Sequence, residues 1–221
     1  MKLLWQALLK FSLGVALVGA LLFLPAGGFS FWNGWLFAGL LFLPMLLLGA
    51  VLLIKAPDLL KKRLNAKENE GAQRGVVALS ALIFLCGFVV AGLDFRFGWS
   101  HVPLWAVIAA SAILLVSYAF YAEVMRENAY LSRTVEVQEG QKVIDTGLYA
   151  AVRHPMYAVT LWLFLAIPVV LGSWWALACF ALYIPVIVVR IINEEKLLIR
   201  ELSGYADYKT RVKFRLVPFV W

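Results

Sequence analysis

Long uninterrupted apolar segments constrain the fold of this chain more than any other feature. Four of them, at about 5–25, 29–54, 75–93 and 102–124, reach the length of about 20 residues that an α-helix needs to cross a bilayer. The composition agrees, because 63% of the 221 residues are hydrophobic and 15% are charged. Soluble domains are about 45–50% apolar and about 25% charged. The sequence therefore predicts an integral membrane protein built as one compact bundle.

A fifth apolar region, at about 156–192, is too long for one helix and contains a turn signal. Gly172 suits the C-terminus of a helix, and Ser173 suits the N-cap of the next. This region predicts a helical hairpin whose short arms either span the bilayer or re-enter it. A tail helix is expected over 194–208, with a turn at Gly204. The expected fold class is all-α: a polytopic membrane bundle of four transmembrane helices, the hairpin and a cytoplasmic tail helix.

Basic residues gather in alternate loops and set the expected orientation. Loop 25–30 carries no charge, and loop 94–101 carries only one aspartate and one arginine. The basic residues of the other three segments are Lys55, Lys61, Lys62, Arg63, Lys67 and Arg74; Arg126, Arg133, Lys142 and Arg153; and Arg190, Lys196, Arg200, Lys209, Arg211, Lys213 and Arg215. The positive-inside rule then predicts a multi-pass protein of the inner (cytoplasmic) membrane, with both termini in the cytoplasm.

The net charge of +7 does not indicate a nucleic-acid-binding protein, because the basic residues lie in loops between apolar segments. There they are expected to set topology and contact lipid headgroups. Cys86 and Cys179 both lie inside apolar segments, and His101 and His154 are the only histidines. Without a Cys/His cluster, neither a zinc site nor a haem site is expected. The sequence gives no sign of an obligate protein partner.

The first polar cluster that could form a site covers 147–157, at the start of the hairpin. Pro155 suits the first turn of a helix, which would place Arg153 and His154 beside unpaired backbone N–H groups that can hold a ligand carboxylate. The aromatic faces of Tyr149 and Tyr157 can attract a cation such as a sulfonium. The alternative is that these side chains are ordinary anchors at the membrane interface.

The second cluster covers 190–195, at the far end of the hairpin. Arg190 and Glu194 are four residues apart and share a helix face, while Glu195 points about a quarter-turn away. Because polar groups at a membrane boundary are costly unless they are exposed, paired or used, two clusters on one side of a hairpin predict a site. The alternative is an ordinary ion pair within the helix. Asp94, Arg96 and His101, on the opposite side, are expected to be solvated loop residues.

With both clusters, the chain resembles the isoprenylcysteine carboxyl methyltransferase family and its bacterial relatives, in the phospholipid methyltransferase-like superfamily. The resemblance covers roughly 123–218. It rests on Thr146-Gly147-Leu148-Tyr149, Arg153-His154-Pro155-Met156-Tyr157, Arg190 through Glu195, and Tyr205-Ala206-Asp207-Tyr208 followed by Val212, Arg215 and Pro218. It implies a membrane enzyme that binds S-adenosylmethionine on the cytoplasmic side and takes a lipid substrate from the bilayer. It also implies transmembrane helices over 1–124 and a cofactor-binding catalytic region over 125–221, within one membrane domain.

The resemblance assigns roles to individual residues. It implies that Arg190 is the catalytic residue that binds the substrate. The implied cofactor contacts are Gln141, Lys142, Val143 and Ile144 beside the adenosine, together with Tyr149, His154, Pro155, Met156, Tyr157 and Glu194. The chain departs from the family at Leu202-Ser203-Gly204, where Phe-Gly is frequent, and the loop before Gly147 aligns only loosely.

The expected function is methyl transfer from S-adenosylmethionine to a membrane-embedded lipid or lipidated acceptor. Arg190 favours an acidic acceptor and hence carboxylate O-methylation, since a guanidinium binds a carboxylate with two parallel hydrogen bonds. One alternative is a phospholipid or amine N-methyltransferase with the same cofactor. Further alternatives are an NADPH-dependent membrane reductase of the sterol type and a non-enzymatic membrane scaffold or transporter.

Overall fold

The computed structural model is a bundle of α-helices that describes residues 2–64, 71–132 and 135–221. Helix makes up 76% of it, and the described residues contain no strand, which confirms the all-α class. The helices are α1 (Lys2–Ala26), α2 (Trp32–Lys55), α3 (Pro57–Leu64), α4 (Gly71–Phe97), α5 (Leu104–Glu127), α6 (Leu148–Ala151), α7 (Pro155–Val170), α8 (Trp174–Ala181), α9 (Tyr183–Glu201) and α10 (Tyr205–Arg211). Lys67 and Arg133, two of the basic loop residues, lie outside the described residues.

Within the described residues, five helical segments are long and apolar enough to cross a membrane. They are Leu3–Ala26, Trp32–Lys55, Gln73–Phe97, Leu104–Glu127 and Trp174–Glu201, and α7 is a shorter apolar helix. The first four agree with the four predicted segments. Many large apolar side chains on these helices are exposed, as expected for helices that face lipid.

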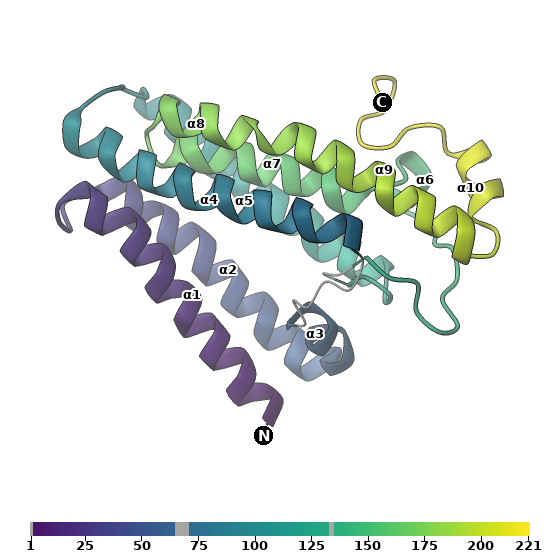
Figure 1. The fold of residues 1–221 in the computed structure, drawn as a ribbon. Helices are drawn as coiled ribbons and strands as arrows, with labels where there is room; N and C mark the ends of the chain where they lie inside the picture. Colours follow the sequence, from purple (N-terminus) through teal and green to yellow (C-terminus); the bar gives the residue numbers. More distant parts are fainter. Residues whose placement is uncertain (1, 65–70, 133–134) are drawn as a thin grey trace.

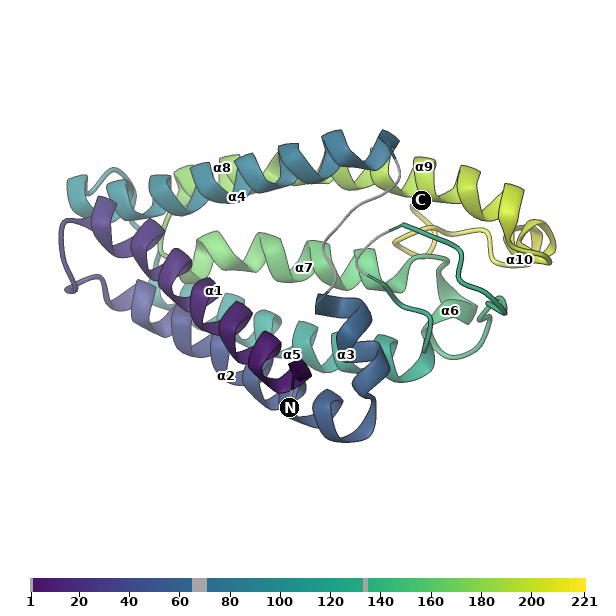
Figure 2. The same cartoon turned by 60° about the horizontal axis from the view of Figure 1, so that its bottom comes forward.

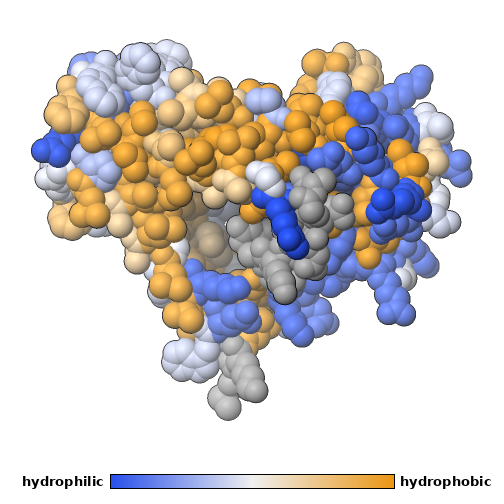
Figure 3. All heavy atoms as spheres, in the orientation of Figure 1, coloured by the Kyte–Doolittle hydropathy of each residue, from blue (hydrophilic) through white to orange (hydrophobic). Residues whose placement is uncertain are grey.

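Figures 1 and 2 show the long helices running back and forth between two ends of the molecule. The loops 27–31, 98–103 and 171–173 lie at one end, called the loop end below. Helices α3, α6 and α10 lie toward the other, called the charged end. Hydrophobic residues spread over the long helices in Figure 3, and hydrophilic residues gather toward the charged end. The segments with most of the basic residues therefore share one end, as the charge pattern predicted.

The predicted hairpin is present, with α7 as its first arm and α8–α9 as its second. Gly172 adopts a left-handed φ of 75°, and Ser173 N–H donates to the Pro168 carbonyl at 3.0 Å, a Schellman closure of α7. The Ser173 hydroxyl accepts from Ala176 N–H at 2.9 Å and caps α8. The second arm is interrupted at Leu182, because Pro185 has no N–H to continue the hydrogen-bond ladder.

The charged segment between α2 and α4, expected to be a loop, contains helix α3. Pro57 begins it and Asp58 lies in its first turn, while its last turn carries Lys61, Lys62 and Arg63. This charge order matches the helix dipole. The Arg63 guanidinium donates to the Tyr121 hydroxyl, which attaches α3 to α5.

Asp94 is not a solvated loop residue, as the sequence had suggested, but a buried one near the end of α4 with 1% exposure. Its carboxylate accepts from Ser100 N–H at 2.8 Å, from the Ser100 hydroxyl at 2.6 Å and from the Ser173 hydroxyl. A buried carboxylate is tolerated when it is fully hydrogen-bonded. Asp94 therefore joins the end of α4 to the turn of the hairpin.

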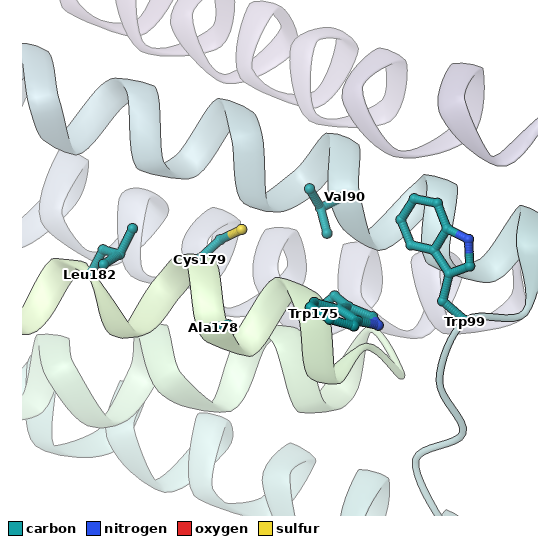
Figure 4. Close-up of a pocket in the computed structure, with 6 residues that line it drawn as sticks. All are labelled: Val90, Trp99, Trp175, Ala178, Cys179 and Leu182. Carbon is teal, nitrogen blue, oxygen red and sulfur yellow. The ribbon is translucent and has the colours of Figure 1, made fainter.

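An apolar hollow of about 350 Å³ lies between α4 and α8, toward the loop end. Figure 4 shows Val90 of α4 opposite Cys179 of α8, with Trp99 and Trp175 at one side. Ala178 and Leu182 complete its lining. Because no charged side chain lines it, this hollow does not suit a charged cofactor.

Candidate functional site

The first polar cluster is fixed to the end of α5 by Gly147. This glycine has a φ of 53°, and a Cβ there would lie 1.4 Å from Glu127 Oε1. Glu127 Oε2 in turn accepts from Leu148 N–H at 3.0 Å, at the start of α6. Only glycine leaves room for this carboxylate, which sets the position of the chain just before Tyr149.

Tyr149 is buried and held on two sides. Its hydroxyl accepts from Asn128 Nδ2 at 2.9 Å, and its carbonyl accepts from the Tyr208 hydroxyl at 2.7 Å. Burial raises the pKa of Tyr149 to about 12 and also raises the pKa of Tyr208. Both side chains are therefore neutral phenols at physiological pH. Tyr149 remains a predicted cofactor contact.

Arg153, Glu195 and Arg215 form an ionic network at the start of α7, in which Arg153 and Glu195 are buried and Arg215 is partly exposed. Arg153 Nε lies 2.7 Å from Glu195 Oε1, and the two side chains are 3% and 4% exposed. Arg215 Nε donates to Glu195 Oε2 at 3.0 Å. The imidazole Nε2 of His154 lies 3.4 Å from Glu195 Oε1. One carboxylate thus faces two guanidinium groups and the imidazole.

The C-terminal tail completes this network through its backbone. Arg153 Nη1 donates to the carbonyls of Val212 and Lys213 at 2.7 and 2.8 Å. The N–H groups of Arg153 and His154 donate to the carbonyls of Phe214 and Arg215, both at 2.9 Å. The tail therefore lies along the N-terminus of α7 and holds it in place.

The two predicted clusters meet at the Tyr157 hydroxyl. Arg190 Nε donates to this hydroxyl at 2.9 Å, and the hydroxyl donates to Glu194 Oε2 at 2.5 Å. All three residues are partly buried. The His154 ring lies beside Tyr157, with their centroids 5.8 Å apart. Residues from opposite arms of the hairpin therefore share one hydrogen-bonded group.

The four residues predicted beside the adenosine divide into two pairs. Val143 packs against the cluster of Leu202, Tyr205, Tyr208 and Val212. Ile144 and Met156 each pack against the cluster of Val124, Tyr149 and Val159. Gln141 belongs to a turn, where its Oε1 accepts from Gln138 N–H at 2.9 Å, and Lys142 is exposed. Val143 and Ile144 thus lie against elements of the site, whereas Gln141 and Lys142 lie on the loop. Pro155 is buried as the first residue of α7.

Tyr205 carries a buried donor that the sequence did not point out as a site group. Its side chain is 4% exposed, and within the described part of the chain its hydroxyl has no hydrogen-bond partner. Burial raises its pKa, with further contributions from the charges of Glu195 and Glu194. The Tyr205 hydroxyl is therefore a neutral, unpaired donor within the described part of the chain.

The sequence placed Arg153 at the helix entry of the first cluster, but it assigned no cofactor or substrate contact to Arg153, Glu195 or Arg215. Arg153 and Arg215 belong to the motifs that carry the family resemblance, which was the available signal. Glu195 was placed about a quarter-turn from the helix face that Arg190 and Glu194 share. That position aims it at Arg153 and Arg215, away from the Tyr157 hydroxyl.

The predicted site residues lie in a part of the chain that matches a known protein family. Residues 105–203 match the model of a family described as phospholipid methyltransferase. The match runs from α5 to just past α9 and includes every predicted site residue. No curated protein matches the chain. The match indicates a membrane methyltransferase and is consistent with the superfamily that contains the isoprenylcysteine carboxyl methyltransferases, without singling that family out.

Proposed function

We propose that this protein is an S-adenosylmethionine-dependent methyltransferase that modifies a lipid or lipidated acceptor at the cytoplasmic face of the inner membrane. The observation that carries the proposal is the Tyr157 hydroxyl, which joins Arg190 and Glu194 within the region that matches the methyltransferase family. Methyltransferases of that family generally use S-adenosylmethionine. The gathering of basic segments at the charged end supports the orientation.

The side chains at the charged end fit the chemistry of this cofactor. The faces of Tyr149 and Tyr157 suit a sulfonium. Glu194 can accept from an amino or hydroxyl group. The unpaired Tyr205 hydroxyl can donate to a carboxylate, and an unpaired buried donor is costly unless a ligand satisfies it, by about 1–3 kcal/mol. Val143 and Ile144 supply apolar surface for the adenine.

Once bound, the cofactor supplies an electrophilic methyl group on a positively charged sulfur. The residues of the chain have to bind the cofactor and the acceptor, align them and shield them from water, and they need not react themselves. Alignment alone can lower the activation barrier by about 7 kcal/mol or more. The Arg190 guanidinium is the group that can hold an anion of the acceptor. The Arg153–Glu195–Arg215 network keeps the start of α7, and with it Tyr157, in a fixed place.

Two acceptor classes follow from different observations. Arg190, partly buried and beside Tyr157, favours a carboxylate and O-methylation. A carboxylate needs no proton acceptor on the protein because it is already ionised. The family match instead favours the amine of a phospholipid and N-methylation. That reaction requires a deprotonated nitrogen, and Arg190 would then hold the phosphate.

Isothermal calorimetry of the purified protein with S-adenosylmethionine, S-adenosylhomocysteine and NADPH tests the cofactor. Both adenosyl compounds should bind, and Glu194→Ala should lose at least tenfold in affinity. The matched control is Glu201→Ala on the same helix, whose side chain pairs at the surface with Arg200 and should leave the affinity unchanged. Binding of NADPH alone would overturn the proposal in favour of a membrane reductase.

Labelled methyl transfer to a farnesylated cysteine or to phosphatidylethanolamine then separates the two acceptors.

A further inference from the structure

Gln73, near the start of α4, is a buried polar residue outside every motif considered so far. Its side chain has 0% exposure. It continues by one turn the face of α4 on which Val76 and Ile83 pack against Ile187 and Ile191 of α9. An apolar residue could extend that packing, but an amide stands there instead.

The two ends of the Gln73 amide differ. Nε2 donates to the backbone carbonyl of Arg190 at 3.3 Å, which orients the amide beside the residue expected to bind the substrate. Oε1 has no hydrogen-bond partner within residues 2–64, 71–132 and 135–221. A buried amide oxygen left unpaired costs free energy, and natural structures retain few such groups.

We propose that Gln73 Oε1 accepts a hydrogen bond from an N–H or O–H group of a ligand held between α4 and α9 beside Arg190. The inference rests on the proposed function for placing a ligand there, and it adds a binding residue from the N-terminal half of the chain, outside the matched region 105–203. Gln73 complements Arg190, since a guanidinium can only donate and the free amide oxygen can only accept. Together the two residues suit a ligand that carries an anionic group and a donor close to each other.

The donor has two possible sources with the same chemistry. The cofactor has an amino group and ribose hydroxyls, and a lipid headgroup can have an amine or a hydroxyl. Gln73→Leu removes the acceptor while keeping an apolar side chain of similar size. Ser80→Ala is the matched control on the same helix, because the Ser80 hydroxyl only donates to the Val76 carbonyl within α4.

Two measurements on the full-length protein in lipid nanodiscs test the proposal. The first is the calorimetric affinity for S-adenosylhomocysteine. The second is the preference for the headgroup of phosphatidylethanolamine, which has N–H donors, over that of phosphatidylcholine, which has none. Gln73→Leu should weaken one of the two by about tenfold, and Ser80→Ala should change neither. Loss of S-adenosylhomocysteine affinity identifies the cofactor as the donor, and loss of the headgroup preference identifies the lipid. Gln73→Leu removes an unpaired buried oxygen but also the hydrogen bond from Nε2 to the Arg190 carbonyl, so its melting temperature is measured alongside to show that the variant is folded.

Unchanged affinity and unchanged preference in a folded Gln73→Leu variant would overturn the inference and leave the methyltransferase proposal standing. A wild-type protein that does not bind S-adenosylhomocysteine, but whose headgroup preference depends on Gln73, would support the inference and overturn the proposed function. A wild type with neither property would overturn both.

Discussion

Arg153 and Glu195, separated by 42 residues of chain, form a buried ion pair with Nε and Oε1 2.7 Å apart. The pair joins the start of α7 to α9, and Arg215 adds the C-terminal tail through Glu195 Oε2. The Glu195 carboxylate therefore joins the start of α7, helix α9 and the C-terminal tail. The hydroxyl of Tyr157, which joins Arg190 to Glu194, lies on the helix that this network holds.

Replacing Glu195 by glutamine should destabilise the protein strongly. The substitution keeps the shape but leaves Arg153 buried without a counter-charge, and breaking one partner of a buried pair costs about 3–5 kcal/mol. We expect the unfolding free energy in mixed detergent micelles to fall by about that amount. Glu201→Gln is the control, because its pair with Arg200 is at the surface and should contribute less than about 1 kcal/mol. Equally small losses of unfolding free energy in both variants would contradict a stabilising role for Glu195.

The fold could be predicted largely from the sequence because its strongest signals are local. The length of each apolar segment fixed the four long helices, and Gly172 with Ser173 fixed the turn of the hairpin. Helix α3 was missed because its eight residues include three basic side chains and no long apolar segment. Asp94 was misplaced because its partners Ser100 and Ser173 come from other segments, and long-range hydrogen bonds leave no periodic pattern.

The site could be predicted only in part, for a related reason. The hairpin and the charge pattern bring Tyr157 and Glu194 to the same end, and the structure places them in contact. The tail contacts of Arg153 depend on backbone carbonyls of Val212 and Lys213, which no residue type signals. Gln73 was equally hidden, because its importance lies in an oxygen without a partner rather than in a motif.

Tyr157→Phe should reduce cofactor affinity without loss of the fold. The ring remains, but Arg190 and Glu194 lose the hydroxyl that connects them, and a hydrogen bond to a charged group contributes about 1.5–3 kcal/mol. We expect affinity for S-adenosylhomocysteine to fall by about 10- to 100-fold in calorimetry. Tyr118→Phe, which loses a single bond to the Leu41 carbonyl between α5 and α2, should bind as the wild type does. A Tyr157→Phe variant with wild-type affinity would remove Tyr157 from the cofactor site.

Arg190→Lys should lower turnover more than it lowers cofactor affinity. Lysine keeps the charge but loses the planar fork that binds a carboxylate or phosphate with two bonds. We expect kcat/KM for the acceptor to fall by about tenfold or more, while S-adenosylhomocysteine affinity changes by less than about threefold. Steady-state kinetics and calorimetry on one preparation measure both. Equal losses in the two quantities would argue that Arg190 acts on the cofactor instead of the acceptor.

Gly147→Ala should disturb the site more than Gly140→Ala does. Both Gly147 and Gly140 have positive φ, at 53° and 69°, so alanine introduces backbone strain at either position. At Gly147 the new Cβ would also displace the Glu127 carboxylate and break its bond to Leu148 N–H, whereas nothing lies within 4 Å of a Cβ at Gly140. We therefore expect Gly147→Ala to lower the melting temperature further and to weaken S-adenosylhomocysteine binding through Tyr149, with binding unchanged in Gly140→Ala. If both variants lost stability equally and kept full affinity, the contact between Glu127 and the first cluster would have no part in placing Tyr149.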